Sequence, residues 1–196
     1  RNRWTADFSK QVTWEKLGEQ GINYSLKYAR MYGGDLEGIK KKIPYLKDVL
    51  AWCKANHGYL MLDFKKGISY QKVVDLVRAE GMEAQVVLIS YNTEQAKALY
   101  KVAPEMLLSV SVRNNDELER ILQTGIPKEK LVAFTGIKVA PDALYQRLNE
   151  LKIPAILGTL GNLDKRAATK GDHLYKEWAQ KGIQIFSTDR PLSVSF

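Results

Sequence analysis

"LMLDFKKG" (residues 60–67) begins like a buried strand but continues with charged side chains inside the same apolar run. Along a strand, residues i and i+2 point to the same side. Asp63 and Lys65 therefore share one face, while Leu62 and Phe64 take the other. Both charged residues lie at the carboxyl end of the expected strand, which is where parallel α/β sheets and barrels build their sites.

Short apolar runs rich in β-formers alternate with helical patterns along most of the chain. The runs cover residues 59–64, 84–90, 105–112, 130–136, 153–159 and 183–188. The helical patterns cover residues 44–55, 70–81, 93–103, 115–125, 141–151 and 165–182, the last of them interrupted by Gly171. Such alternation predicts βαβ units and a parallel sheet.

The number of strands leaves two arrangements of this sheet open. A (β/α)₈ barrel needs eight strands, and six are found, so either two are missing or the sheet is open and doubly wound. A Gly-rich phosphate-binding motif after the first strand would favour the open sheet. The stretch found there, "DFKKGISYQK" (63–72), contains neither a dinucleotide fingerprint nor a P-loop. Residues 1–40 show no comparable strand and are expected to be an insertion.

Composition limits the classes of partner. The 196 residues include 30 Lys and Arg against 22 Asp and Glu, for a net charge of +8, and suit one globular domain. The basic residues are spread along the chain, so we expect a solvated surface and no nucleic-acid partner. No run approaches the roughly 18 apolar residues of a membrane span. Cys53 is the only cysteine and is expected in the core.

Two readings of Asp63 and Lys65 follow from chemistry alone. They could form a structural ion pair, although desolvating both charges is costly and such pairs add little stability. Alternatively, Asp63 could bind a hard cation while Lys65 offers a positive charge to a phosphate. Mg²⁺ and Ca²⁺ prefer carboxylate oxygens, and Mg²⁺ often binds substrate phosphate as well.

Four stretches together resemble one enzyme family, the glycerophosphodiester phosphodiesterases. "IPYLKDVLAWCKANHGYLMLDFK" (43–65) is similar to the family's helix and third strand, which ends Glu-x-Lys or Asp-x-Lys. "IFSTDRP" (185–191) resembles its closing strand with Thr-Asp-x-Pro. "RWTADFSKQVTWEKL" (3–17) and "ILGTLGNLDKRAATKGD" (156–172) are similar to the region after its second histidine and to the seventh-strand loop of a subgroup.

The resemblance covers essentially the whole chain and implies a (β/α)₈ TIM barrel of which about six βα units are present. Residues 1–196 would form a single incomplete barrel domain. Within it, residues 1–42 would be an insertion-like segment and residues 43–196 would supply units three to eight. We expect the chain to be the C-terminal portion of a longer parent protein.

The resemblance also implies a site and a cofactor. Asp63 falls on the family's metal-binding carboxylate, for Mg²⁺ or Ca²⁺, and Lys65 on the lysine near the phosphate. Lys165, like Arg113, could meet a phosphate or an anionic headgroup. Asp189 is expected to be structural, tying the last loop to the barrel. Other possible pocket residues at strand ends are Tyr91, Ser111, Arg113, Phe134 and Asn162.

The family's histidine motifs, His-Arg-Gly and His-Asp, are absent from this chain. Its two histidines, His57 and His173, are expected to be surface or packing residues. We therefore predict that a longer parent hydrolyses glycerophosphodiesters to an alcohol and glycerol phosphate, within lipid metabolism, and that this chain alone is inactive. The subgroup resemblance suggests a periplasmic or secreted protein.

Other functions stay open at this stage. The chain could be a catalytically silent barrel remnant that binds a phosphorylated ligand or a protein. Its protein partner would then be the missing N-terminal segment or another copy of the chain. A weaker alternative is an unrelated phosphate-binding barrel such as an isomerase, for which "LGTLGN" (157–162) is a faint signal.

Overall fold

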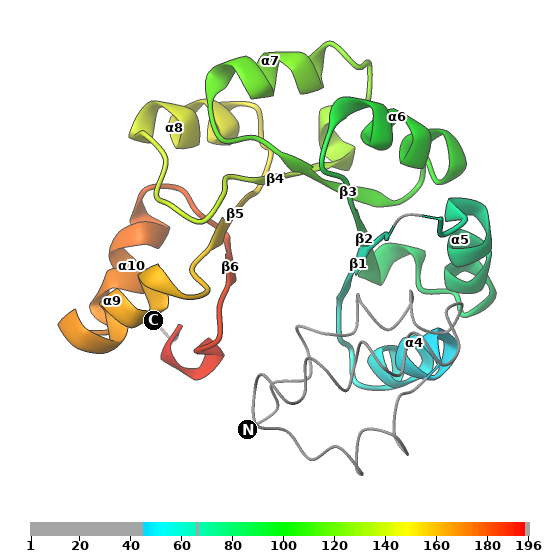
Figure 1. Ribbon diagram of the computed structural model, residues 1–196, viewed down its shortest axis with the longest axis horizontal. Helices are drawn as coiled ribbons and strands as arrows, with labels where there is room; N and C mark the ends of the chain where they lie inside the picture. Colours follow the sequence, from blue (N-terminus) through cyan, green and yellow to red (C-terminus); the bar gives the residue numbers. More distant parts are fainter. Residues whose placement is uncertain (1–44, 66, 195–196) are drawn as a thin grey trace. The chain divides into compact units, whose positions relative to one another are not determined.

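A computed structural model describes residues 45–65 and 67–194 of the chain as alternating strands and helices (Figure 1). The prediction for residues 1–42 and the expected helix start at Pro44 lie outside these residues. The chain divides into two compact units, one ending at Ile89 and the other starting at Ser90.

The described part of the first unit is a two-stranded parallel βαβ unit preceded by a helix. Its elements are α4 (Leu46–Ala55), β1 (Leu60–Asp63), α5 (Tyr70–Ala79), the 3₁₀ helix η1 (Glu83–Gln85) and β2 (Val86–Ile89). Strands β1 and β2 pair in parallel, from Leu60 opposite Val86 to Asp63 opposite Ile89. A parallel pair needs a crossover connection, and α5 supplies it.

The second unit contains four parallel strands in chain order, each joined to the next by a helical connection. Its first elements are α6 (Thr93–Val102), β3 (Leu107–Ser111), α7 (Asn115–Leu122), η2 (Lys128–Lys130), β4 (Leu131–Phe134) and α8 (Asp142–Glu150). The remaining elements are β5 (Ala155–Gly158), α9 (Asn162–Lys170), α10 (His173–Gln180), β6 (Ile185–Ser187) and η3 (Pro191–Ser193).

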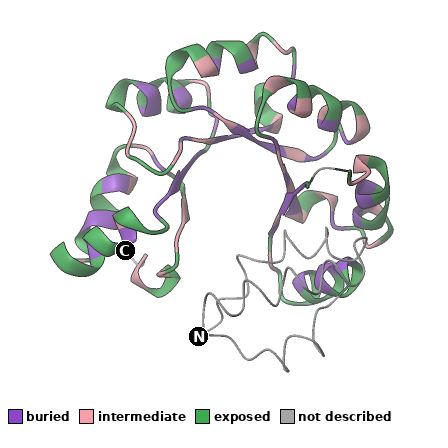
Figure 2. Cartoon of the chain, viewed as in Figure 1, coloured by how far each residue is buried: buried purple, intermediate pink, exposed green. Residues whose placement is uncertain are grey.

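Helices α6, α7 and α8 all lie on one side of the strands of the second unit (Figure 1). A doubly wound sheet carries helices on both faces, whereas a (β/α)₈ barrel carries them on the outside only. The buried residues concentrate in the strands and on one face of each helix (Figure 2). All four residues of β5 are buried, as expected for a strand covered on both faces. This arrangement favours the barrel over the open sheet.

The predicted order of elements is confirmed, with differences of a few residues at their ends. The long helical pattern predicted at 165–182 forms two helices. The first helix ends before Gly171, whose φ is +114°. Only glycine adopts such a conformation without strain. Cys53 is buried on α4, as predicted, and burial raises the pKa of its thiol.

Candidate functional site

Asp63 and Lys65 form an ion pair at the carboxyl end of β1. Asp63 is the last residue of the strand and is only 9% exposed. The Lys65 ammonium donates a hydrogen bond to its Oδ2 atom. On the opposite face, Phe64 is buried with its ring edge-on to Tyr70 of α5, at a centroid distance of 4.9 Å. The predicted alternation of the two faces is therefore confirmed.

The other carboxylate oxygen of Asp63, Oδ1, is buried and has no hydrogen-bond partner in the described part of the chain. A buried carboxylate oxygen is normally satisfied by a donor or a cation. A hard cation would fit this oxygen, since Mg²⁺ and Ca²⁺ take carboxylate ligands. Residues 45–65 and 67–194 contain no group of three or more Asp, Glu, His or Cys side chains that could complete a metal site. The described residues therefore do not form a complete metal site by themselves.

Three of the five predicted pocket residues line one hollow in the second unit. Tyr91 follows β2, Ser111 is the last residue of β3, and Arg113 lies in the loop that follows β3. The hollow is lined by Tyr91, Asn92, Thr93, Ser111, Arg113, Glu117, Arg120 and Ile121. Sequence reasoning had singled out none of the other five lining residues.

The remaining two predicted pocket residues lie elsewhere in the second unit. Phe134 ends β4 and is half-buried, and its ring is close to Gly158, where a Cβ atom would meet the Phe134 Cε2 atom at 3.2 Å. Asn162 is exposed and begins α9. Neither lines the hollow beside Arg113.

The guanidinium of Arg113 is held by Glu117. Its Nη2 and Nε atoms donate to Glu117 at 2.6 Å and 3.0–3.1 Å, and the backbone N–H of Arg113 donates to Glu117 Oε2 at 2.7 Å. These hydrogen bonds from Arg113 lower the pKa of the Glu117 carboxyl. The pair also completes the start of α7, where Asn114 Oδ1 accepts from the Glu117 N–H at 2.9 Å.

The start of α6 shows the same pattern of side-chain to backbone hydrogen bonds. Asn92 Oδ1 accepts from the Gln95 N–H at 2.8 Å, and Gln95 Oε1 accepts from the Tyr91 N–H at 2.9 Å. Both are variants of a capping box, in which two side chains satisfy free N–H groups at a helix start. The loops after β2 and β3 are therefore each held by side-chain hydrogen bonds at the start of the next helix. Arg113 as a phosphate ligand stays a prediction.

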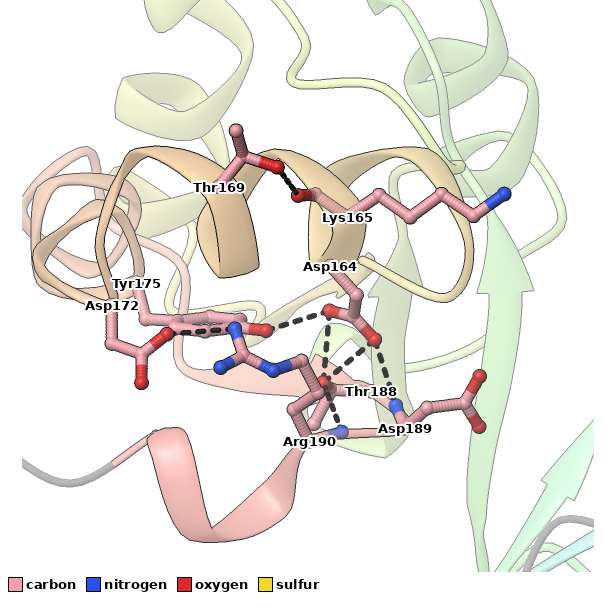
Figure 3. Close-up of polar contacts among 8 residues, drawn as sticks. All are labelled: Asp164, Lys165, Thr169, Asp172, Tyr175, Thr188, Asp189 and Arg190. Atoms are coloured by element: carbon pink, nitrogen blue, oxygen red, sulfur yellow. Dashed lines mark hydrogen bonds and ion pairs between the residues drawn. The ribbon is translucent and has the colours of Figure 1, made fainter.

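A second buried carboxylate, Asp164 on α9, is a residue that sequence reasoning missed (Figure 3). Its oxygens accept hydrogen bonds from the Tyr175 hydroxyl at 2.8 Å, the Thr188 hydroxyl at 2.9 and 3.0 Å, and the Asp189 N–H at 2.8 Å. A signal was present in the sequence, because Asp164 occupies the same helical face as the buried Ala167.

Asp189 helps to tie the last loop, as expected, but it does so through its backbone and not through its carboxylate. Asp189 contributes its backbone N–H to the network, while the residue itself is exposed and its carboxylate points away from Asp164 (Figure 3). The carboxylate that accepts these hydrogen bonds is that of Asp164. Lys165, the next residue, directs its ammonium away from the same network (Figure 3).

Both histidines lie on the surface. His57 is exposed in the turn before β1, at the amino end of that strand and at the opposite end from Asp63. His173 begins α10 and lies 3.7 Å from Glu177. No described helix is long and apolar enough to cross a membrane.

The strands and helices define a class of fold, namely part of a (β/α)₈ barrel. Comparison with solved structures identifies its type. The chain is similar to a glycerophosphoryl diester phosphodiesterase from Parabacteroides distasonis, with a TM-score of 0.69 and 22% sequence identity over 77% of this chain and 53% of that one. It is also similar to a glycerophosphodiester phosphodiesterase from Agrobacterium tumefaciens, with a TM-score of 0.55 and 17% identity over 77% and 60% of the two chains.

These similarities show that the chain has the fold of glycerophosphodiester phosphodiesterases, as the sequence resemblance had predicted. No protein-family model matches the sequence, and neither does any curated protein. The chain spans 53–60% of the length of the two solved structures.

Proposed function

We propose that this chain supplies one half of the active site of a metal-dependent glycerophosphodiester phosphodiesterase. The reaction would be carried out by a longer parent protein and would yield an alcohol and glycerol phosphate. Asp63 would be one ligand of a divalent cation, Mg²⁺ or Ca²⁺, and Lys65 would bind a phosphate oxygen of the substrate. The neighbouring solved structures support this reading through their fold and their names.

The observation that carries the proposal is the unsatisfied Oδ1 atom of Asp63. A structural ion pair would be expected to satisfy both oxygens, because an unpaired buried acceptor costs about 1–3 kcal/mol. Here Lys65 binds Oδ2 only, and the described residues leave Oδ1 without a donor. An oxygen kept free at the carboxyl end of a barrel strand fits a cation ligand better than a stabilising pair.

Lys65 suits the second role because its side chain is 43% exposed. Its ammonium is tied to Asp63 by a single hydrogen bond and is accessible to an anion from solvent. A divalent cation, when bound, would neutralise charge on the phosphate during in-line attack. Lys65 would add a second positive charge on a flexible stem, which suits a phosphate oxygen as a point charge.

General acid and base groups would have to come from outside this chain. Proton transfer near neutral pH is most often assigned to histidine, and His57 and His173 are the only histidines in the sequence. His57 lies at the wrong end of β1, and His173 faces Glu177 on the surface. The 196-residue chain by itself is therefore expected to bind a cation but not to turn over substrate.

The binding half of the proposal can be tested on this chain. Isothermal titration with Mg²⁺ and with Ca²⁺ should give a signal that Asp63→Asn abolishes. Asp75→Asn is the matched control, since Asp75 is an exposed carboxylate on α5 of the same unit that pairs with Gln71 and Arg78. Equal cation binding by the wild type and Asp63→Asn would overturn the metal assignment.

The catalytic half needs the parent protein. That protein should hydrolyse bis(p-nitrophenyl) phosphate or a glycerophosphodiester in Mg²⁺ or Ca²⁺, and a chelator or Asp63→Asn should remove the activity. If the parent lacks activity while this chain still binds the cation through Asp63, the alternative proposal applies. The protein would then be a silent barrel that binds phosphorylated ligands.

A further inference from the structure

The chain that follows β6, from Thr188 to Ser193, is fastened to the rest of the second unit at two places. We call Thr188–Ser193 the closing segment. Its first fastening is made to Asp164 of α9 and its second to Asp172, the residue before α10 (Figure 3). The two acceptors differ in burial and in the kind of donor that they bind, so the two fastenings should respond differently to solvent.

The inner fastening is buried and uses neutral donors. Asp164 is 4% exposed and accepts from the Thr188 hydroxyl and the Asp189 N–H of the closing segment. It also accepts from the Tyr175 hydroxyl of α10 at 2.8 Å. Thr188 in turn accepts the Arg190 N–H at 2.9 Å. One carboxylate therefore connects α9, α10 and the first half of the closing segment.

The outer fastening is an ion pair open to water. Arg190 Nη1 lies 2.7 Å from Asp172 Oδ1, with the two side chains 29% and 45% exposed. The hydrogen bond from Arg190, followed by one from Ser193, lowers the pKa of the Asp172 carboxyl. Exposed ion pairs of this kind are weak and are screened by salt. Arg190 also interacts with the Tyr175 side chain of the inner fastening. The rest of the second half is held by local turns, such as the bond from the Ser193 N–H to the Arg190 carbonyl at 3.0 Å.

A hollow lies between the closing segment and α9. The segment contributes Asp189 and Arg190 to its lining, and the helix and the residue before it contribute the rest. The hollow is lined by Gly161, Asp164, Lys165, Ala168, Asp189 and Arg190. Movement of Arg190 would therefore change the width of the hollow, whereas the hydrogen bonds of Asp164 keep the Asp189 backbone in place.

We propose that the closing segment is a strap held by two latches, the inner fastening at Asp164 and the outer fastening at Asp172, and that release of the outer latch alone opens the hollow beside α9. The inner latch then acts as the hinge, because Asp164 holds Thr188 and Asp189 while Arg190–Ser193 swing away from Asp172. This inference does not depend on the proposed phosphodiesterase activity.

Amide hydrogen exchange in this chain, read residue by residue by NMR, tests the strap. The Asp189 amide reports the inner latch and the Ser193 amide the outer one. Raising sodium chloride from about 0.1 M to about 1 M shortens the Debye length from about 10 Å to about 3 Å. It should speed exchange at Ser193 by up to about fivefold, the range expected for an exposed ion pair, and leave Asp189 unchanged.

Two variants separate the latches. Asp172→Asn should reproduce the effect of salt at Ser193 and leave Asp189 protected, whereas Asp164→Asn should speed exchange at both. If Asp164→Asn does not fold, Tyr175→Phe is used in its place, because it removes one donor to Asp164. The exchange rate of the Asp189 amide should then increase. Asp142→Asn is the matched control, because Asp142 forms an exposed pair with Lys181 at 2.8 Å in the same unit. It should change neither amide.

The opposite outcomes overturn the proposal. Equal acceleration of Asp189 and Ser193 by Asp172→Asn would mean that the segment opens as one piece. No response of Ser193 to salt or to Asp172→Asn would mean that the outer ion pair holds nothing. An unchanged exchange rate of the Asp189 amide in a folded Asp164→Asn variant would show that Asp164 does not hold the segment.

Discussion

Replacement of Asp63 by leucine should make the metal-free chain more stable. Asp63 is 9% exposed, and its Oδ1 atom is buried without a partner in the described residues. Removing an unsatisfied buried acceptor should return about 1–3 kcal/mol. The lost ion pair subtracts at most about 1 kcal/mol, because the Lys65 side chain is 43% exposed and its charge is screened by water. The expected net gain lies between about 0 and about 3 kcal/mol, centred on about 1–2 kcal/mol.

Thermal unfolding in the presence of chelator measures this gain. For a chain of about this length, 1 kcal/mol shifts the midpoint by about 2–4 °C, so Asp63→Leu should unfold about 2–8 °C higher than the wild type. Added Mg²⁺ or Ca²⁺ should stabilise the wild type, by about 2.7 kcal/mol at a hundredfold excess over Kd, and should leave the variant unchanged. Asp63→Ala is a second test variant, because alanine is too small to cause the overpacking that leucine could introduce.

The reasoning is refuted if both Asp63→Leu and Asp63→Ala unfold well below the wild type in chelator. That outcome would show that the ion pair with Lys65 stabilises the fold, and that Asp63 is structural. A residue kept for function is expected to lower stability, since sites retain groups that a purely structural optimum would remove. The sign of the change therefore distinguishes the two readings without any activity assay.

Three further predictions concern the second unit. Glu117→Gln should cost about 1 kcal/mol of unfolding free energy near neutral pH, by urea titration, because the Arg113 pair lowers the pKa of Glu117 and its contribution is present above the ordinary value of 4.5. Below that value the wild type should lose this stability as Glu117 is protonated. If Glu117→Gln loses as much unfolding free energy on acidification as the wild type does, the assignment is contradicted. Tyr145→Phe should cost about 1–2 kcal/mol by the same titration, because the buried hydroxyl accepts the Ala140 N–H at 3.1 Å; no change would mean that water replaces the hydroxyl. Gly171→Ala should lower the thermal midpoint, by about 1 kcal/mol or more in free energy, since φ is +114° and the new Cβ would meet His173 Nδ1 at 2.5 Å; a stabilised variant would refute the need for glycine there.

The order of strands and helices was predictable because local signals are strong in this chain. Each strand is a short apolar run, and several helices begin at a capping residue such as Asn92 or Asn114. The shared face of Asp63 and Lys65 followed from the alternation of side chains along a strand. These features depend on residues within a few positions of one another, which a sequence shows directly.

The candidate site was less predictable where its contacts are distant in sequence or compete with local ones. Arg113 was predicted only as a possible phosphate contact, and the sequence did not show that Glu117, in the first turn of α7, binds its guanidinium. Asp164 was missed because its partners Tyr175 and Thr188 stand 11 and 24 positions further on. No spacing rule connects such residues before the fold is known.

The contrast between the two buried carboxylates gives the strongest support for a role of Asp63 beyond folding. Asp164 shows how this chain satisfies an acid that it buries for structure, with donors from Tyr175, Thr188 and Asp189 on both oxygens. Asp63 is nearly as buried, yet the described residues satisfy only one of its oxygens, and they do so with a partly exposed lysine. Because the same chain can satisfy a buried carboxylate fully, an acid left half satisfied at a strand's carboxyl end points to a ligand as its missing partner.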